Sequence, residues 1–171
     1  AGAGIPDVRF GMIGNLQPNE ITAVLGCSDL IHSISSLHLA EAVASRASRR
    51  IEDGLLDAAQ PVLLEVNVSG EETKSGFSVD EVRQAIAHLQ TLYGIRVCGL
   101  MTMAPRGDKK MARATFAGLR QLRDELSVEY PDLSLDELSC GMSEDFEIAL
   151  EEGSTIVRLG RVVFDPAFAV E

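Results

Sequence analysis

The chain has 171 residues, of which 26 are acidic and 15 are basic, so its formal net charge is −11 at pH 7. This length suits one domain with a substantial core and is too short for two large domains. The negative charge repels the phosphates of nucleic acids and of anionic lipids, so we expect neither a nucleic acid nor a membrane as a partner. Any phosphate group that binds must be held by local groups.

The cysteines and the N-terminus bear on the cellular compartment. Cys27, Cys98 and Cys140 lie among apolar neighbours without CxxC spacing, which predicts reduced cysteines in the core. No apolar run approaches the roughly 18 residues of a membrane span. The N-terminal sequence AGAGIPDVRF lacks a basic region followed by a hydrophobic segment. These features predict a soluble, cytoplasmic protein.

The first part of the chain predicts a strand, a short helix, a second strand and a longer helix. An apolar run at 8–14 ends in glycine and asparagine, one or two helical turns follow at 20–25, and a short strand ends at Ser33. Ser35 or Ser36 can cap the next helix. Its apolar residues recur close to helical spacing and are Leu37, Ala40, Val43, Ala44 and Ala47.

The clearest strand runs from Val62 to Val68. It is rich in β-branched residues and almost continuously apolar, as expected of a strand that is buried on both faces. A polar loop bounded by glycines follows. Ser78 and Glu81 then form a capping box for a helix that continues through Leu92.

The last part of the chain repeats the pattern. A strand at 95–103 precedes an amphipathic helix at 112–126. Two further strands, at 138–142 and 155–159, flank a helix that we expect to begin at Ser143. The inward-facing residues of the amphipathic helix are Phe116, Leu119, Leu122 and Leu126.

Six predicted strands, which begin near residues 8, 30, 62, 97, 138 and 155, alternate with helical segments. Such alternation of buried strands and helices predicts a parallel α/β sheet. Polar residues or glycines follow most of these strands, at the edge where barrels and open α/β sheets bind ligands. GxGxxG after the first strand and GxxxxGK[ST] are both absent from the sequence. A barrel-type phosphate site after the last two strands fits better.

Residues 141–143 and 160–161 are the candidate anion site. Ser143 is a plausible N-cap, and a helix N-terminus offers unpaired N–H groups to a phosphate. Arg158 stands two residues before Gly160, so it can place a fixed cation in a pocket while the glycine lets a ligand approach the backbone. The alternative is that Ser143 only caps a helix and Arg158 only pairs with an acid.

Six stretches are distinctive when they are read together. They are MIGNLQPN at 12–19, IHS at 31–33, VLLEVNVSGEETKSGF at 62–77, GLMTMAP at 99–105, SCGMSEDFE at 139–147 and EGSTIVRLG at 152–160. Together they resemble the pyridoxal phosphate (PLP) homeostasis protein family, whose members are similar to the N-terminal barrel domain of alanine racemase. The resemblance covers essentially the whole chain.

This resemblance implies a (β/α)8 TIM-type barrel of the fold-type III class of PLP proteins. About six of its eight strands lie in this chain, so we expect residues 1–171 to be a single PLP-binding domain that is incomplete at its N-terminus. The implied function is intracellular PLP (vitamin B6) homeostasis without clear catalytic turnover. The implied partners are the cofactor itself and PLP-dependent apo-enzymes, and the sequence leaves the oligomeric state open.

Two other functions are weighed against this one. The chain could be a PLP-dependent, racemase-like enzyme in which Cys140, or a residue that precedes the chain, moves a proton. A fold-type III racemase usually carries a second β-domain, and the tail after Phe164 is too short for one. A structural remnant that binds nothing is the third reading.

The resemblance also implies a set of site residues. Arg158 matches the arginine that faces the pyridine nitrogen, where its permanent charge keeps that nitrogen unprotonated and weakens the ring as an electron sink. The phosphate cup is formed by the residues around Ser143 and by those around Gly160. The full set of implied cofactor-binding residues is Ser139, Gly141, Met142, Ser143, Arg158, Gly160 and Arg161.

The sequence departs from the family pattern at four positions. Arg161 replaces a small hydroxyl residue, so one side-chain contact to phosphate is lost while the backbone donor remains. Gly11 stands where histidine is usual, Glu20 replaces a common lysine, and Asp165 falls where a glycine usually ends the last strand. These changes affect the rim of the pocket.

The family's lysine that forms the aldimine with PLP should precede Val8, together with the first two strands. Lys74, Lys109 and Lys110 are the lysines of the chain, and none falls at that position. We therefore expect solvated loop lysines, no catalytic residue and noncovalent binding of PLP. The first and last predicted strands should be open edges.

Overall fold

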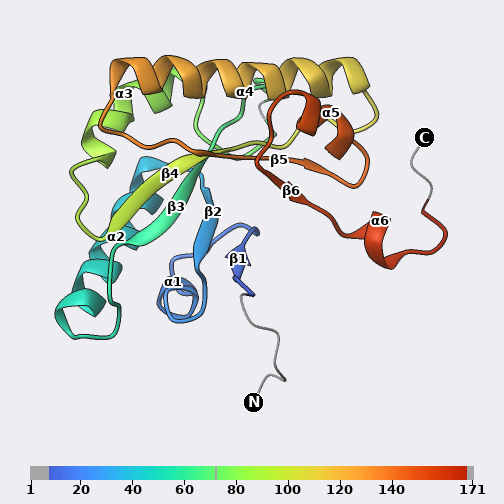
Figure 1. Cartoon of the computed structure of the whole chain (residues 1–171). Coiled ribbons are helices and arrows are strands. Elements are labelled where there is room, and N and C mark those ends of the chain that lie inside the picture. The colour runs from blue at the N-terminus through green and yellow to red at the C-terminus, as the bar shows by residue number, and fades with distance from the viewer. Residues whose placement is uncertain (1–7, 72, 169–171) are drawn as a thin grey trace.

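The computed structural model describes residues 8–71 and 73–168. In this part of the chain, strands and helices alternate throughout (Figure 1). The strands are β1 (Gly11–Met12), β2 (Leu30–Ile34), β3 (Gln60–Glu65), β4 (Ile95–Met101), β5 (Glu137–Met142) and β6 (Ile156–Arg158). The helices are α1 (Ile21–Val24), α2 (Leu37–Glu52), α3 (Val79–Leu89), α4 (Lys109–Glu129), α5 (Phe146–Glu151) and α6 (Arg161–Phe164).

The six strands form one parallel sheet in the order β1-β2-β3-β4-β5-β6. Each strand therefore lies beside its neighbour in sequence, which is the order of a (β/α) barrel. A doubly wound sheet would reverse its order at a switch point. Figure 1 shows the sheet curving, with α2, α3 and α4 around its outside. The described strands are thus part of a barrel, and β1 and β6 are its two edges, as expected.

The main core lies between the sheet and its outer helices. Alternate strand residues such as Val62 and Leu64 pack there against buried apolar faces of α2, α3 and α4. Leu63, Cys98 and Met101 form a second small cluster of buried residues. Because Leu63 lies between Val62 and Leu64, it points to the opposite face of β3. The prediction that this strand is buried on both faces is confirmed.

The capping residues predicted from the sequence are found at the N-termini of α2 and α3. Ser36 caps α2 by accepting a hydrogen bond from the Leu39 N–H, and the predicted capping box of Ser78 and Glu81 is present. Helix α4 begins earlier than expected because the Asp108 side chain accepts a hydrogen bond from the Met111 N–H. In residues 8–71 and 73–168, no helix combines the length and the apolar character needed to cross a membrane.

Two predictions about local structure are wrong. Helix α5 begins at Phe146 and not at Ser143, because a turn comes first in which Asp145 bonds to both the N–H and the carbonyl of Met142. Cys27 is exposed and lies outside the core, because it stands in the turn after the short helix α1. The other two cysteines are buried, as predicted.

Candidate functional site

A cavity of about 590 Å³ opens at the carboxyl ends of the strands, beside β5 and β6. Its walls come from Ile13 after β1, His32 of β2, the loop after β4, the turn after β5, and residues 156–161. These are segments from across the chain, and the barrel order brings their ends to the same edge. The position agrees with the prediction of a ligand site after the last two strands.

Ser143 joins the two halves of the predicted anion site. Its Oγ accepts hydrogen bonds from the N–H of Gly160 at 3.4 Å and from the N–H of Val162 at 3.2 Å. Segments 141–143 and 160–162 are therefore in contact. The Arg161 N–H, which lies between them in sequence, donates to no acceptor in the described part of the chain. Backbone N–H groups that converge in this way suit an anion.

The glycines at the site have different roles. A Cβ added to Gly160 would meet no atom within 4 Å, so this position leaves open space beside the convergent N–H groups. Gly141 has a positive φ of 92°, and a Cβ there would lie 2.5 Å from the Cβ of Ala149. Gly141 is thus required for the turn from β5 toward α5. It does not line the cavity.

Arg158 projects from the end of β6 and is held by two neighbouring strands. Its Nη1 donates to the carbonyl of Ser139 at 2.9 Å and to the Ser139 Oγ at 2.7 Å. Its Nη2 donates to the carbonyl of Thr102 at 3.0 Å. Burial lowers the pKa of the guanidinium from its ordinary value, yet an arginine stays charged in proteins.

No carboxylate in the described part of the chain lies within 4 Å of the Arg158 guanidinium. Among residues 8–71 and 73–168, Arg158 therefore forms no ion pair of the kind that the alternative requires. The Nε–H and one Nη2 hydrogen also have no acceptor among the described residues. Arg158 is a fixed cation with spare donors at the wall of the cavity; it has no ion pair among the described residues, and the carboxylates of Asp145 and Glu65 act on it only from a greater distance, in the direction that raises its pKa.

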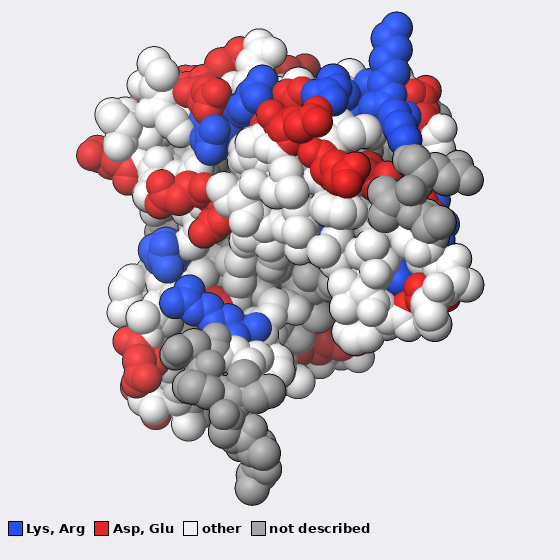
Figure 2. Space-filling view, turned by 45° about the vertical axis from the view of Figure 1, so that its right-hand side comes forward, with Lys and Arg blue, Asp and Glu red and all other residues white. Residues whose placement is uncertain are grey.

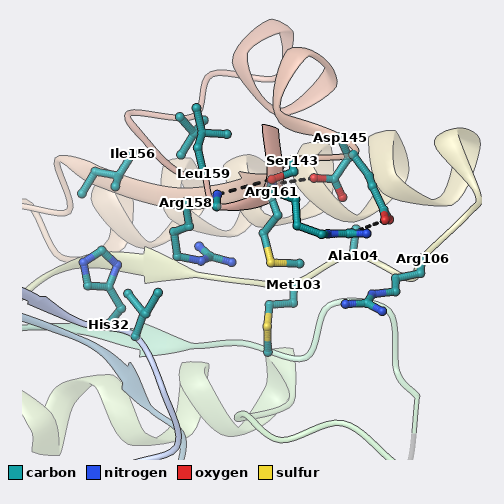
Figure 3. A pocket seen from close by; sticks show the side chains of 15 residues that line it. His32, Met103, Ala104, Arg106, Ser143, Asp145, Ile156, Arg158, Leu159 and Arg161 are labelled. Carbon is teal, nitrogen blue, oxygen red and sulfur yellow. Dashed lines mark hydrogen bonds and ion pairs between the residues drawn. The ribbon is translucent and has the colours of Figure 1, made fainter. Parts of the chain in front are cut away.

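His32 lies beside Arg158 in the cavity wall (Figure 3). The side chain is buried, and its Nδ1 is 2.9 Å from the Oγ of Ser139. Burial, together with the nearby positive charge of Arg158, lowers the pKa of His32 to about 4, while Glu137 acts in the opposite direction. The imidazole is therefore neutral near pH 7.

Arg161 occupies the other side of the cavity. It forms an ion pair with Glu144, and its guanidinium lies 5.1 Å from the centre of the Phe168 ring. Figure 3 shows the Arg161 side chain extended toward Ala104, with Arg106 beyond it. Both charged partners, Arg161 and Glu144, line the cavity.

The positive charge at the cavity is local. Figure 2 shows acidic and basic side chains mixed along the top of one face, over the region of α4, while the recessed middle of that face is mostly uncharged. The charged residues that line the cavity are Arg106, Arg158, Arg161, Glu144 and Asp145, so the positive charge there comes from a few nearby arginines.

The structure brings most of the predicted site residues together. Those that line the cavity are Met142, Ser143, Arg158, Gly160 and Arg161. Ser139 and Gly141 do not line it: Ser139 is fully buried and anchors Arg158. Sequence reasoning gave no role to His32, Met103 or Arg106, although all three line the cavity. The sequence feature that could have identified these three residues is their position at or just after the carboxyl ends of predicted strands.

No lysine lines the cavity, although Lys74 contacts one of its wall residues. Lys74 pairs with Glu71 at 3.2 Å and donates to the carbonyl of Met103 at 3.3 Å. Lys109 and Lys110 open helix α4. None of the three lines the cavity. Among the described residues, no group of three or more His, Cys, Asp or Glu side chains could hold a metal ion.

Comparison with known proteins identifies the family. The family model described as "Alanine racemase, N-terminal domain" matches residues 2–166. The chain belongs to this family. Within it, a pyridoxal phosphate homeostasis protein of Aquifex aeolicus is 41% identical over 159 residues, which are 92% of this chain and 67% of that protein. The Synechocystis protein of the same name is 33% identical over 166 residues, which are 95% of this chain and 72% of that one.

Several solved structures share the fold of this chain. PipY of Synechococcus elongatus, solved without PLP, matches with a TM-score of 0.84 and 32% identity over 94% of this chain and 72% of PipY. PipY with PLP bound matches with a TM-score of 0.81 and 31% identity over the same shares. An alanine racemase of Clostridium difficile, 17% identical over 92% of this chain and 39% of that one, matches with a TM-score of 0.70 and supports the barrel fold alone.

Proposed function

We propose that this chain binds PLP reversibly and serves PLP homeostasis, without clear catalytic turnover. The observation that carries the proposal is Arg158, a fixed cation with spare donors and with no carboxylate within 4 Å among the described residues, in the wall of a cavity that also holds convergent backbone N–H groups. The names of the relatives and the PLP-bound structure of PipY support the same ligand.

The donors at the cavity fit the chemical groups of PLP. The hydroxyl of Ser143 and the backbone N–H of Arg161, which has no acceptor among the described residues, would hold the phosphate, while the N–H groups of Gly160 and Val162 donate to the Ser143 Oγ and shape this side of the cavity. Arg158 would face the pyridine nitrogen and keep it unprotonated, because a guanidinium can donate a hydrogen bond and cannot give up its proton. Bound PLP supplies an electron sink, which is weak when its ring nitrogen is unprotonated.

The side chains at the cavity support the non-catalytic reading over a racemase. Cys140, the candidate proton-transfer group, is buried and does not line the cavity, and burial raises the pKa of its thiol. His32, which lines the cavity, has a pKa of about 4 and is a weak base near neutral pH. We further propose that residues 1–171 act as a single PLP-binding domain, since one main core joins the sheet to its helices.

The proposal extends to partners and place. We propose that PLP-dependent apo-enzymes receive the cofactor and that the protein works in the cytoplasm. The cavity walls include the exposed residues Ile13 and Leu159, so a bound ligand has a route to the surface. The three cysteines are free thiols, as is usual in a reducing compartment. The oligomeric state is independent of this proposal.

Calorimetric titration of the 171-residue chain with PLP tests the proposal. We expect saturable binding with one site, and competition by inorganic phosphate because both ligands need the groups around Ser143. Arg158→Leu should weaken PLP binding. An absence of saturable binding, or PLP binding that phosphate does not affect, would contradict the proposal.

A further inference from the structure

His32 and Ser139 make a contact across the inside of the partial barrel. They come from β2 and β5, which are separated in the sheet by β3 and β4. His32 is 4% exposed and Ser139 is 0% exposed, and the His32 Nδ1 lies 2.9 Å from the Ser139 Oγ. The same Oγ accepts a hydrogen bond from the Nη1 of Arg158 at 2.7 Å. His32 and Arg158 therefore both hydrogen-bond to the hydroxyl of Ser139.

The proton positions in this group follow from what each side chain can donate. A guanidinium only donates, so the Ser139 Oγ accepts from Arg158 and has one proton left to give. No acceptor other than the His32 Nδ1 is available to that proton among the described residues. The Ser139 hydroxyl therefore donates to Nδ1, and the single imidazole proton of His32 sits on Nε2. The low pKa of His32 agrees with this neutral form.

We infer that His32 is a positioning residue for Arg158: by accepting the Ser139 proton, it fixes the hydroxyl that holds the guanidinium in the cavity wall. The inference rests on the proposed function, in which Arg158 faces the pyridine ring of PLP. Thr102 holds the Nη2 end of the guanidinium through its carbonyl. Without His32, the hydroxyl of Ser139 is free to rotate, and Nη1 loses one of its two oriented acceptors, since only the carbonyl of Ser139 remains.

Gly11 offers a way to disturb His32 without touching Arg158. A Cβ added to Gly11 would lie 3.0 Å from the Nε2 of His32 and 3.4 Å from its Cδ2, so the imidazole packs directly against the glycine. Gly11 lies in the edge strand β1 and is exposed, and its φ is not positive. Gly11→Ala should therefore displace the imidazole slightly and disturb its contact with Ser139, at small cost to the backbone.

The first experiment uses the ligand-free chain. Nitrogen NMR of the imidazole rings near pH 7 should show His32 as the neutral tautomer with its proton on Nε2. Ser139→Ala should remove the hydrogen bond and shift the Nδ1 signal. A cationic His32, or a proton on Nδ1 in the wild-type chain, would overturn the inference whether or not PLP binds.

The second experiment compares the binding of PLP with the binding of inorganic phosphate. Inorganic phosphate has no pyridine ring and therefore does not make the contact with Arg158. His32→Leu and Gly11→Ala should each weaken PLP binding roughly tenfold, the scale of one hydrogen bond to a charged group, and leave phosphate affinity within about twofold. His32→Asn, whose amide oxygen can replace Nδ1 as the acceptor, should restore most of the PLP affinity. If His32→Leu does not fold, Gly11→Ala carries the comparison.

The outcomes separate this inference from the proposed function. Equal losses of PLP and phosphate binding would mean that His32 only supports the fold, and unchanged PLP binding in all variants would also overturn its positioning role. If the wild-type chain binds phosphate and not PLP, the proposed function fails. The tautomer of His32 then still decides whether the hydroxyl of Ser139 is oriented as inferred.

Discussion

The hydroxyl of Ser143 accepts a hydrogen bond from the N–H of Val162 at 3.2 Å, across 19 positions of sequence. This contact ties the turn after β5 to the residues that follow β6, and a second hydrogen bond from Gly160 reinforces it. Ser143 thus shapes the anion site by joining its two halves. The sequence predicts a place for Ser143 in the anion site and also predicts that it caps the next helix; the capping role is wrong, since α5 begins at Phe146.

Ser143→Ala should weaken phosphate binding. The substitution removes the acceptor that gathers the N–H groups of Gly160 and Val162, and it removes a hydroxyl donor to the ligand. We expect a loss of roughly 1 kcal/mol, or about fivefold, in phosphate affinity, which calorimetry measures. Ser45→Ala, at an exposed position of α2, is the matched control. Equal affinities in both variants would show that Ser143 does not contribute.

Arg158→Leu should weaken PLP binding by about 1.5–3 kcal/mol, the range for a hydrogen bond to a charged group. Arg158→Lys should keep part of the affinity, since it retains the charge and loses the fork of donors. Fluorescence titration with PLP measures both. Arg96→Leu is the control for lost positive charge, because Arg96 is exposed on β4 and does not line the cavity. A similar loss with Arg96→Leu would mean that only net charge matters.

The sequence predicts the fold well because its signals are local. Apolar runs, the capping box at Ser78 and the glycines mark six strands and their helices, and alternation of the two implies a parallel sheet. The first strand is shorter than the predicted run at 8–14. It pairs only at Gly11 and Met12, since β1 has a single neighbour in the described sheet.

The site is only partly predictable because its contacts are long-range. Arg158 and Gly160 are recognisable from their spacing at a strand end, and the resemblance to a family adds the rest of the phosphate cup. The partners of Arg158 are Ser139 and the carbonyl of Thr102, and no local pattern reveals either hydrogen bond. His32 contacts Ser139 across 107 positions of sequence, and the curvature of the sheet brings β2 and β5 close enough for this contact.

Glu144→Gln should strengthen phosphate binding. The substitution releases Arg161, now paired with Glu144, at the edge of the cavity. Both side chains are substantially exposed, so we expect a gain of only about twofold to fivefold that shrinks as salt is added. Glu147→Gln makes the same change of charge at an exposed position outside the cavity wall. An equal gain in both variants would mean that the effect is one of net charge.

Arg161→Thr tests the same ion pair from the other side. It restores a small hydroxyl residue of the kind that the family commonly has at this position. Calorimetry in the Arg161→Thr background should show no benefit from Glu144→Gln, since there is no arginine left to release. A persistent gain in the double variant would rule out the ion pair as the cause.

The stability of the chain should fall as pH decreases from about 6.5 toward 4, in part because of His32. Its pKa in the folded chain is about 4, below the ordinary value of 6.5, so the unfolded chain binds the proton more tightly. The contribution of the neutral His32 ring to the free energy of unfolding is therefore fully present above pH 6.5 and is lost as the pH falls toward 4. The full loss is of order 3 kcal/mol.

Urea denaturation at several pH values measures this dependence. His32→Asn cannot titrate, so it should flatten the slope of unfolding free energy between pH 6.5 and 5. His88→Asn is the control, because His88 is exposed and pairs with Glu41 on the surface. If both variants keep the wild-type slope, His32 does not carry the effect.

Borohydride treatment of the chain with PLP should leave no pyridoxyl-lysine. Formation of that product needs a lysine amine at the PLP aldehyde, and none of the three lysines lines the cavity. The Nζ of Lys74 pairs with Glu71 and donates to the carbonyl of Met103, which holds this amine outside the cavity wall. Mass spectrometry of the digested chain checks each lysine, and a chain denatured before addition of PLP shows the background of surface labelling. Noncovalent binding would be contradicted by a saturable adduct at Lys74 that forms only in the folded chain and that Arg158→Leu abolishes. Such an adduct would mean that Lys74 breaks its ion pair with Glu71 and moves into the cavity.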